Sequence, residues 1–214
     1  VGIIFMGLGA SLIFLANHAP AYAALALVAA LLHTLNHALF KSLLFLGAGA
    51  IADATHTLEL NQLGGLLRRL PAVGVAILIG CASIAGLPLL NGFVSELLTF
   101  QSFVAGSTLE ALPARIVLPL MAGVLALIGG LAAACFVNLF GVAFLGRARS
   151  SAAETARAVP QSMRNGMLLL AAACVAVGVF PTPVLNHLIA VAHTLIPASS
   201  LPASLPAEVA GVQR

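Results

Sequence analysis

The sequence has very little charge. Only 7% of its 214 residues are Asp, Glu, Lys or Arg, and tryptophan is absent. A soluble domain carries roughly 25% charged residues, so this chain lacks the polar surface that water requires. Hydrophobic residues make up 61% of the chain, which predicts an all-α, polytopic membrane protein built from several apolar helices.

Cysteines and basic clusters are also scarce. Cys81, Cys135 and Cys174 lie singly within apolar runs, which argues against a disulfide framework or a metal site and favours simple packing roles. No dinucleotide-binding motif is present, so we expect the chain to bind no cofactor or metal. The net charge of +3 is spread between apolar runs, without the basic patch that would indicate a nucleic-acid partner.

The apolar runs predict about five transmembrane spans, one of them a broken helix. We expect these spans at residues 1–16, 21–52, 71–103, 116–145 and 166–180. Because the second run is longer than a membrane requires, we expect it to tilt or to contain a locally unwound turn. The chain opens at Val1 within an apolar run that lacks the charged start of a signal peptide, so we expect it to be the C-terminal part of a longer protein.

Residues 1–183 are expected to form one transmembrane domain. Residues 184–196 are predicted to be a short amphipathic or truncated helix, lying on the surface or beginning a further span. Residues 197–214 are rich in Pro, Ala and Ser, which is typical of a disordered tail or a linker.

Arginines predict the orientation. With five spans, the connections 53–70 and 146–165 lie on one side of the membrane, and six arginines occur in them, namely Arg68, Arg69, Arg147, Arg149, Arg157 and Arg164. The connections on the opposite side contain one arginine, Arg115, if the distal Arg214 is left aside. The positive-inside rule therefore places both connections in the cytoplasm. We expect the membrane to be a bacterial inner membrane.

Titratable residues lie within the second span. His33, His37 and Lys41 are separated by steps of four residues, so on a helix they form one stripe that drifts only about 40° per step. Snorkelling of Lys41 to the membrane surface would explain the lysine alone, but His37 lies about 6 Å deeper. Ionisable groups at that depth are costly, and function is the usual reason for them.

The third span carries signals for a break. Pro88 removes a backbone donor, Gly86 and Gly92 loosen the chain on either side, and Asn91 is expected to cap a new half-helix. Glu96 follows one turn later, on the outer side of the midplane in the predicted orientation. A proline kink without a transport role is the simpler alternative, but a kink together with a carboxylate within the membrane is much less common.

Together these groups predict a proton path. Groups that are costly to keep charged in hydrocarbon exchange protons readily, and histidine titrates near neutral pH. The gaps along the stripe exceed hydrogen-bonding reach, so water has to bridge them. We expect protons to pass from His33, His37 and Lys41 to Glu96 and then to the outer side.

Four segments carry a resemblance to a known family. They are LLHTLNHALFKSLLFLGAGAI, LGGLLRRLP, IAGLPLLNGFVSELLTFQSF and CFVNLFGVAFLGRARS. Together they resemble the antiporter-like membrane subunits, which include the proton-pumping subunits of complex I, the large subunits of Mrp-type sodium/proton antiporters and membrane subunits of group 4 nickel-iron hydrogenases. The likeness is strongest to the hydrogenase branch, and it covers residues 1–150 better than the remainder.

The resemblance implies a fold of about fourteen helices in two inverted repeats, of which this chain would hold roughly the last five. It places the residues matching His33, His37 and Lys41 on the central hydrophilic axis, and the residue matching Glu96 at the outward proton exit. It also implies other membrane subunits and a peripheral redox arm as partners, with protons or sodium ions as the transported species.

The chain departs from the family pattern at two positions; Asn138 leaves room for a scaffold subunit, whereas a single proline still suffices for the helix break. The hydrogenase branch usually has lysine where this chain has Asn138, and the family commonly has a proline pair where this chain has Pro88-Leu89. The main expectation is a proton-translocating subunit of a hydrogenase, formate hydrogenlyase or complex I-like NADH:quinone oxidoreductase. The alternatives are a scaffold subunit that does not pump and a subunit of an Mrp-type Na⁺/H⁺ antiporter.

Overall fold

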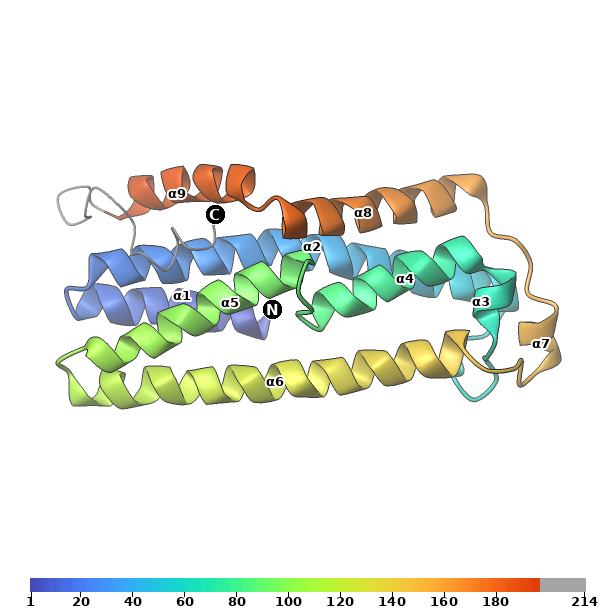
Figure 1. Cartoon of the computed structure of the whole chain (residues 1–214), viewed down its shortest axis with the longest axis horizontal. Coiled ribbons are helices and arrows are strands. Elements are labelled where there is room, and N and C mark those ends of the chain that lie inside the picture. Colours follow the sequence, from blue (N-terminus) through green and yellow to red (C-terminus); the bar gives the residue numbers. More distant parts are fainter. Residues whose placement is uncertain (197–214) are drawn as a thin grey trace.

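Helix α2 runs along the whole length of the molecule, and the other helices lie beside it (Figure 1). The computed structural model describes residues 1–196, and within them no strand occurs. The elements in chain order are α1 (Gly2–Ala16), α2 (Pro20–Thr55), α3 (Leu66–Arg69), α4 (Pro71–Ile84), α5 (Asn91–Ala105), the 3₁₀ turn η1 (Gly106–Thr108), α6 (Leu112–Phe144), α7 (Ser151–Glu154), α8 (Gln161–Val179) and α9 (Thr182–Leu195). The predicted all-α transmembrane bundle is confirmed.

Local sequence explains where the long helices begin. Pro20, Pro71, Pro113 and Pro183 stand in the first turns of α2, α4, α6 and α9, where proline fits the helix and its missing N–H costs nothing. Helices α2, α6 and α8 are each long and apolar enough to cross a membrane, whereas α1 and α4 are shorter apolar helices. With 36 residues, α2 is about 54 Å long and uninterrupted, so the unwound turn considered as an alternative to tilt does not occur.

The predicted break in the third span lies between α4 and α5. Residues 85–90 leave the helix, with Gly86 at φ +65° and Leu89 at φ +70°, and Pro88 is exposed in this loop. The expected capping role of Asn91 is wrong: Leu90 holds the cap position in extended conformation, and Asn91 is the first helical residue, without a capping hydrogen bond. The two half-helices lie end to end along α2 (Figure 1).

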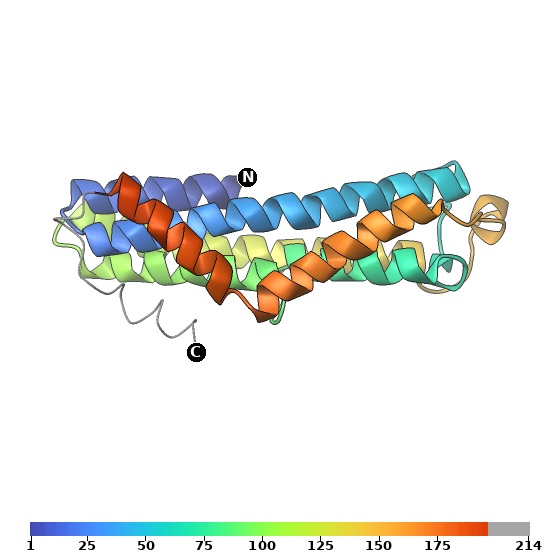
Figure 2. The same cartoon turned by 90° about the horizontal axis from the view of Figure 1, so that it is seen from above.

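A second interruption between helices follows near the end of the described chain. Helices α8 and α9 meet at Phe180 and Pro181, and Figure 2 shows them as the two arms of a shallow V. This joint lies against the first break, because a Cβ atom at Gly178 would come 2.5 Å from the carbonyl oxygen of Leu89. The two interruptions therefore support each other in the middle of the bundle.

Helix α9 belongs to the bundle. Leu185 and Ala192 of α9 are buried in one apolar cluster with Leu25 and Leu32 of α2, and Leu98 of α5. The predicted short helix is thus present and is packed on α2. The domain boundary at residue 183 stays a prediction, and the tail expected at 197–214 lies outside the described residues.

The two arginine-containing connections meet at one end of the molecule. The Ser150 hydroxyl donates to the carbonyl of Gln62 at 2.7 Å, and the Arg149 guanidinium donates to that of Leu60 at 3.1 Å. The backbone N–H of Gly65 donates to Leu145 O at 2.9 Å. The two connections therefore lie on the same side of the bundle. The location of that side in the cytoplasm stays a prediction.

We expect the Gly92→Ala substitution to destabilise the protein by about 1–3 kcal/mol, because the new methyl group would collide with the carbonyl oxygen of Ser83 at the break. The measurement is the midpoint of thermal unfolding of the full-length subunit within its complex. Gly130→Ala is the matched control, since a Cβ at Gly130 meets no atom within 4 Å. Equal midpoints for the two variants would contradict the close approach of α4 and α5.

Candidate functional site

The predicted titratable residues line one cavity. We call it the central cavity; it has a volume of about 270 Å³ and lies between α1, α2, α4, α5 and α6. Its walls are formed by Val1, Gly2, Ile3, His33, His37, Phe40, Lys41, Ile84, Glu96, Ile128, Ala132 and Phe136. His33 is buried, whereas His37, Lys41 and Glu96 are partly buried. The stripe on α2 and the carboxylate on α5 therefore face the same space.

Aromatic rings contact the members of the stripe. The ring centroids of His33 and His37 are 6.4 Å apart, and Phe40 lies edge-on to both at 6.1 and 5.6 Å. The Lys41 Nζ atom lies 5.6 Å from the ring centroid of Phe45, a cation–π contact. The spacing between the two imidazole rings exceeds hydrogen-bonding reach.

No hydrogen bond or ion pair joins any two of His33, His37, Lys41 and Glu96 within the described part of the chain. A transferred proton would therefore have to pass through water. The central cavity is large enough for several water molecules, since each occupies about 30 Å³ in the liquid.

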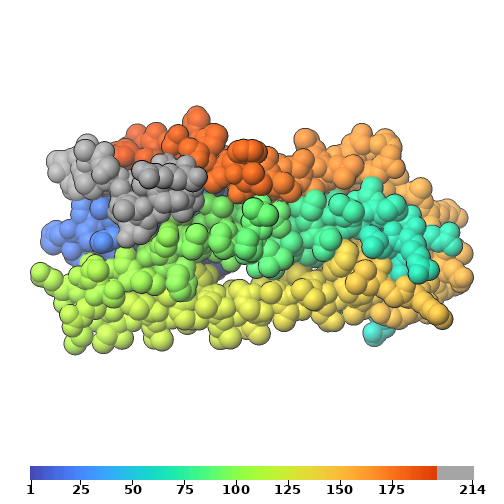
Figure 3. Space-filling view, viewed as in Figure 1, coloured from blue at the N-terminus to red at the C-terminus, as the bar shows by residue number. Residues whose placement is uncertain are grey.

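Glu96 lies between two cavities. Besides the central cavity it borders a second space of about 220 Å³, the α5–α6 cavity, lined by Gly86, Phe93, Glu96, Leu97, Phe100, Leu125, Ala126 and Gly129. Figure 3 shows a furrow between the green-to-teal atoms of α5 and α4 and the yellow atoms of α6. Gly86 leaves the room that the carboxylate occupies, because a Cβ atom there would contact Glu96 Oε2.

A polar seam between α2 and α5 supports the site, and it was not among the features predicted from the sequence. His33 Nδ1 lies 3.0 Å from Ser95 Oγ, and Asn36 Nδ2 donates to Asn91 O at 2.7 Å and to Ser95 Oγ at 3.1 Å. Asn36 follows His33 by three residues and therefore shares its helix face. The spacing of three residues could have indicated from the sequence that Asn36 belongs to the site. A prediction based on ionisable groups alone does not include asparagine.

Further buried polar groups surround the break. The side chains of Ser83 and Asn91 are fully buried and form no hydrogen bond within the described residues, and the Cys174 thiol of α8 lies beside both. Asn138 does not reach the central cavity and lies exposed on α6. Residues 1–196 contain no cluster of three or more His, Cys, Asp or Glu that could hold a metal ion.

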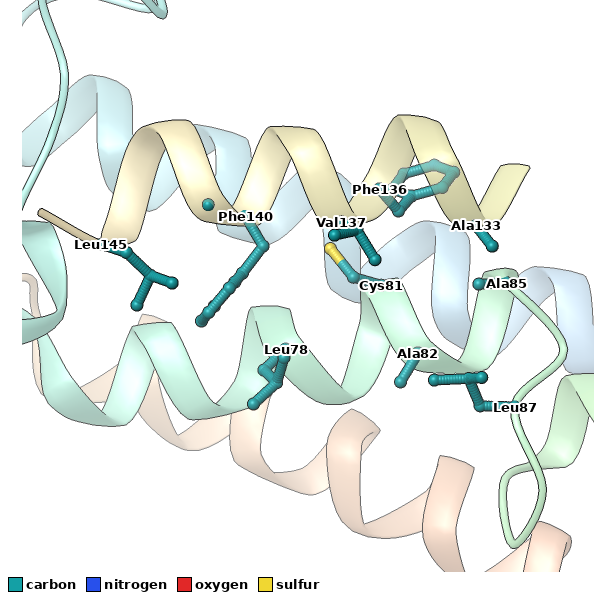
Figure 4. Close-up of a pocket in the computed structure, with 11 residues that line it drawn as sticks. Leu78, Cys81, Ala82, Ala85, Leu87, Ala133, Phe136, Val137, Phe140 and Leu145 are labelled. Carbon is teal, nitrogen blue, oxygen red and sulfur yellow. The ribbon is translucent and has the colours of Figure 1, made fainter. Parts of the chain in front are cut away.

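A groove of similar size to the central cavity is entirely apolar. It lies between α4 and α6, has a volume of about 270 Å³ and contains no ionisable carboxylate, lysine, arginine or histidine in its walls (Figure 4). Its walls include Leu78 and Ala82 of α4 and Phe136 and Phe140 of α6. Proton exchange needs titratable groups, and of these two spaces the central cavity is the one lined by histidine, lysine and glutamate side chains.

Several known proteins are similar to this chain in sequence. Residues 8–122 match the family described as NADH:quinone oxidoreductase/Mrp antiporter, TM. Hydrogenase-4 component B of Escherichia coli (strain K12) is 44% identical over 193 residues, which is 90% of this chain and 29% of that protein. Formate hydrogenlyase subunit 3 of the same organism is 44% identical over 179 residues, covering 84% of this chain and 29% of that protein. The chain thus spans less than a third of these relatives.

Solved structures support the same fold. A chain of the Mrp complex from Dietzia sp. DQ12-45-1b superposes with a TM-score of 0.69 and 21% identity, over 86% of this chain and 40% of that chain. A chain of respiratory complex I from Thermus thermophilus gives a TM-score of 0.55 and 22% identity, over 87% of this chain and 44% of that chain. The family match extends over more than half of the sequence, and the chain therefore belongs to the NADH:quinone oxidoreductase/Mrp antiporter transmembrane family.

Proposed function

We propose that this chain is part of a proton-translocating membrane subunit of a redox-driven complex. The complex would be a group 4 hydrogenase or formate hydrogenlyase, or a complex I-like NADH:quinone oxidoreductase. The observation that carries the proposal is that His33, His37, Lys41 and Glu96 line one cavity within an apolar bundle. Similarity to hydrogenase-4 component B and formate hydrogenlyase subunit 3 supports the hydrogenase assignment.

The proposed path follows α2 and then crosses to α5. Protons move between the two histidines and Lys41 through bridging water and reach the Glu96 carboxylate across the central cavity. Glu96 also borders the α5–α6 cavity, so protonated Glu96 can release its proton on the other side of the break. The helix break allows this position, since unwound backbone within a membrane occurs where protein or a wet cavity surrounds it.

Orientation and partners complete the proposal. The end of the molecule that contains the connections 53–70 and 146–165 faces the bacterial cytoplasm, as the six arginines in them favour. Glu96 then lies on the outer side of the membrane midplane. In this proposal partner subunits carry the redox chemistry, and the polar residues of the described site exchange protons.

Membership of a Na⁺/H⁺ antiporter is the second candidate function. A Na⁺/H⁺ antiporter protein of Alkalihalophilus pseudofirmus is 39% identical over 107 residues, which is 50% of this chain and 13% of that protein. The scaffold alternative, which rested on Asn138, receives less support, because that side chain is not part of the central cavity. Sodium-driven transport without a redox partner separates the antiporter from the redox-driven pump.

We expect Lys41→Ala and Glu96→Gln each to lower proton translocation by at least about tenfold, because each removes one proton-exchanging group from the central cavity. The measurement is acidification of vesicles that contain the assembled complex with its full-length subunit. Glu110→Gln is the matched control for the carboxylate, since Glu110 is exposed outside both cavities.

Normal translocation by Lys41→Ala or Glu96→Gln in an assembled complex would refute the proposed path. Translocation that continues without electron transfer and follows a sodium gradient would instead establish the antiporter. A wild-type complex that turns over without moving protons would identify a scaffold.

We also expect Gly86→Ala to slow translocation by about tenfold without removing any titratable group. The added methyl group would meet the Glu96 carboxylate and displace it from the point where the two cavities meet. Gly146→Ala is the control for backbone strain alone, because Gly146 has φ +75° and open space around its Cβ position. Equal rates in the two variants would show that the carboxylate tolerates displacement.

A further inference from the structure

The Ser95 hydroxyl lies where α2 meets the first turn of α5. Three groups surround its oxygen: Asn36 Nδ2 at 3.1 Å, His33 Nδ1 at 3.0 Å and the carbonyl oxygen of Gly92 at 3.0 Å. Ser95 and Asn36 are fully buried, and His33 is 2% exposed. A hydroxyl has one proton to donate and two lone pairs that accept, so these three partners use its full capacity.

Chemistry fixes the direction of the two hydrogen bonds that Asn36 forms, one with Asn91 O and one with Ser95 Oγ. The carbonyl oxygen of Asn91 only accepts, so the atom of Asn36 that faces it at 2.7 Å has to be the amide nitrogen. The second proton of that amide points to Ser95 Oγ. Ser95 is therefore an acceptor toward Asn36, whichever way its own proton points.

The proton of Ser95 has two possible acceptors. It donates to Gly92 O, or it turns toward His33 Nδ1. In the first arrangement His33 Nδ1 has to carry a proton and donate it to Ser95. In the second, Nδ1 is unprotonated and the neutral ring carries its proton on Nε2.

We propose that Asn36 and Ser95 are positioning residues that hold neutral His33 with its proton on Nδ1. Nε2 is then the nitrogen that takes up and releases protons toward the central cavity, whose wall His33 forms. The role in transport rests on the proposed function, whereas the position of the proton on the ring does not.

The chemistry of the charged ring favours this arrangement. An imidazolium carries protons on both nitrogens, so its Nδ1–H has to donate to Ser95. With Ser95 already donating to Gly92, a proton binds and leaves Nε2 while every other hydrogen bond of the seam stays in place. The opposite tautomer would require the buried hydroxyl to rotate at each protonation.

The experiment is solid-state NMR on the full-length subunit in its complex, with ¹⁵N-labelled histidine, because the ring ¹⁵N shifts distinguish the two tautomers. The His33 signals are assigned by their loss in His33→Gln. We expect wild-type neutral His33 to be protonated on Nδ1. In Ser95→Ala the Nε2–H tautomer should appear, and translocation should fall by about tenfold.

Ser102→Ala is the matched control. Ser102 is also a fully buried serine of α5 that donates to the carbonyl three residues earlier, at 2.7 Å, but it contacts no histidine. In the Ser102→Ala variant, the ¹⁵N signals of His33 should equal those of the wild type. Ser95→Thr retains the hydroxyl and should restore the Nδ1–H tautomer.

Two results would overturn the inference: wild-type His33 protonated on Nε2, or His33 signals in Ser95→Ala that match those in Ser102→Ala. The wild-type spectrum decides even if the alanine variant does not assemble. Failure of the proposed function has a different signature, namely normal translocation by His33→Gln, Lys41→Ala and Glu96→Gln, with the tautomer of the wild type unchanged.

Discussion

The contact between α2 and the α4–α5 break is the constraint on which the rest of the structure depends. Residues 85–90 leave the helix in the middle of the bundle, and an unsatisfied backbone group in hydrocarbon costs several kcal/mol. The backbone groups of this loop therefore need hydrogen-bond partners within the protein, even though the side chains of Leu87 and Leu89 are exposed. Asn36 of α2 donates to the carbonyl of Asn91, and α8 brings Gly178 against Leu89 from another side. The joint between α8 and α9 therefore packs directly against the first break.

The same contact brings the titratable groups together. The first turn of α5 packs on α2 through Ser95, which brings Glu96, the next residue, to the edge of the cavity that His37 and Lys41 also line. Glycine at position 86 leaves space for the carboxylate. Glu96 therefore depends on the loop as well as on its own helix, because an unbroken α4–α5 span would not have this turn at all.

Much of this arrangement could be predicted from the sequence, because it depends on local spacing. Steps of four residues place His33 and Lys41 on one face whatever the helix packs against, and Gly86 and Pro88 interrupt a helix through their own backbone chemistry. The seam depends instead on how α2 and α5 are aligned, with Asn36 and Ser95 separated by 59 residues, and a single sequence does not encode that directly. The prediction that Asn91 caps α5 was wrong by one position. Leu90 is the extended residue before the helix, and Asn91 is its first residue.

Helix α6 shows how position on a helix decides which residues take part. Ile128, Ala132 and Phe136 line the central cavity at steps of four, so α6 contributes an apolar wall. Asn138 lies two residues beyond Phe136, about 200° around the helix, and its exposure agrees with that angle. All four titratable groups come from α2 and α5. An effect of position 138 on transport would therefore have to arise on the outer face of α6, through whatever contacts that face in the assembled complex, rather than inside the cavity.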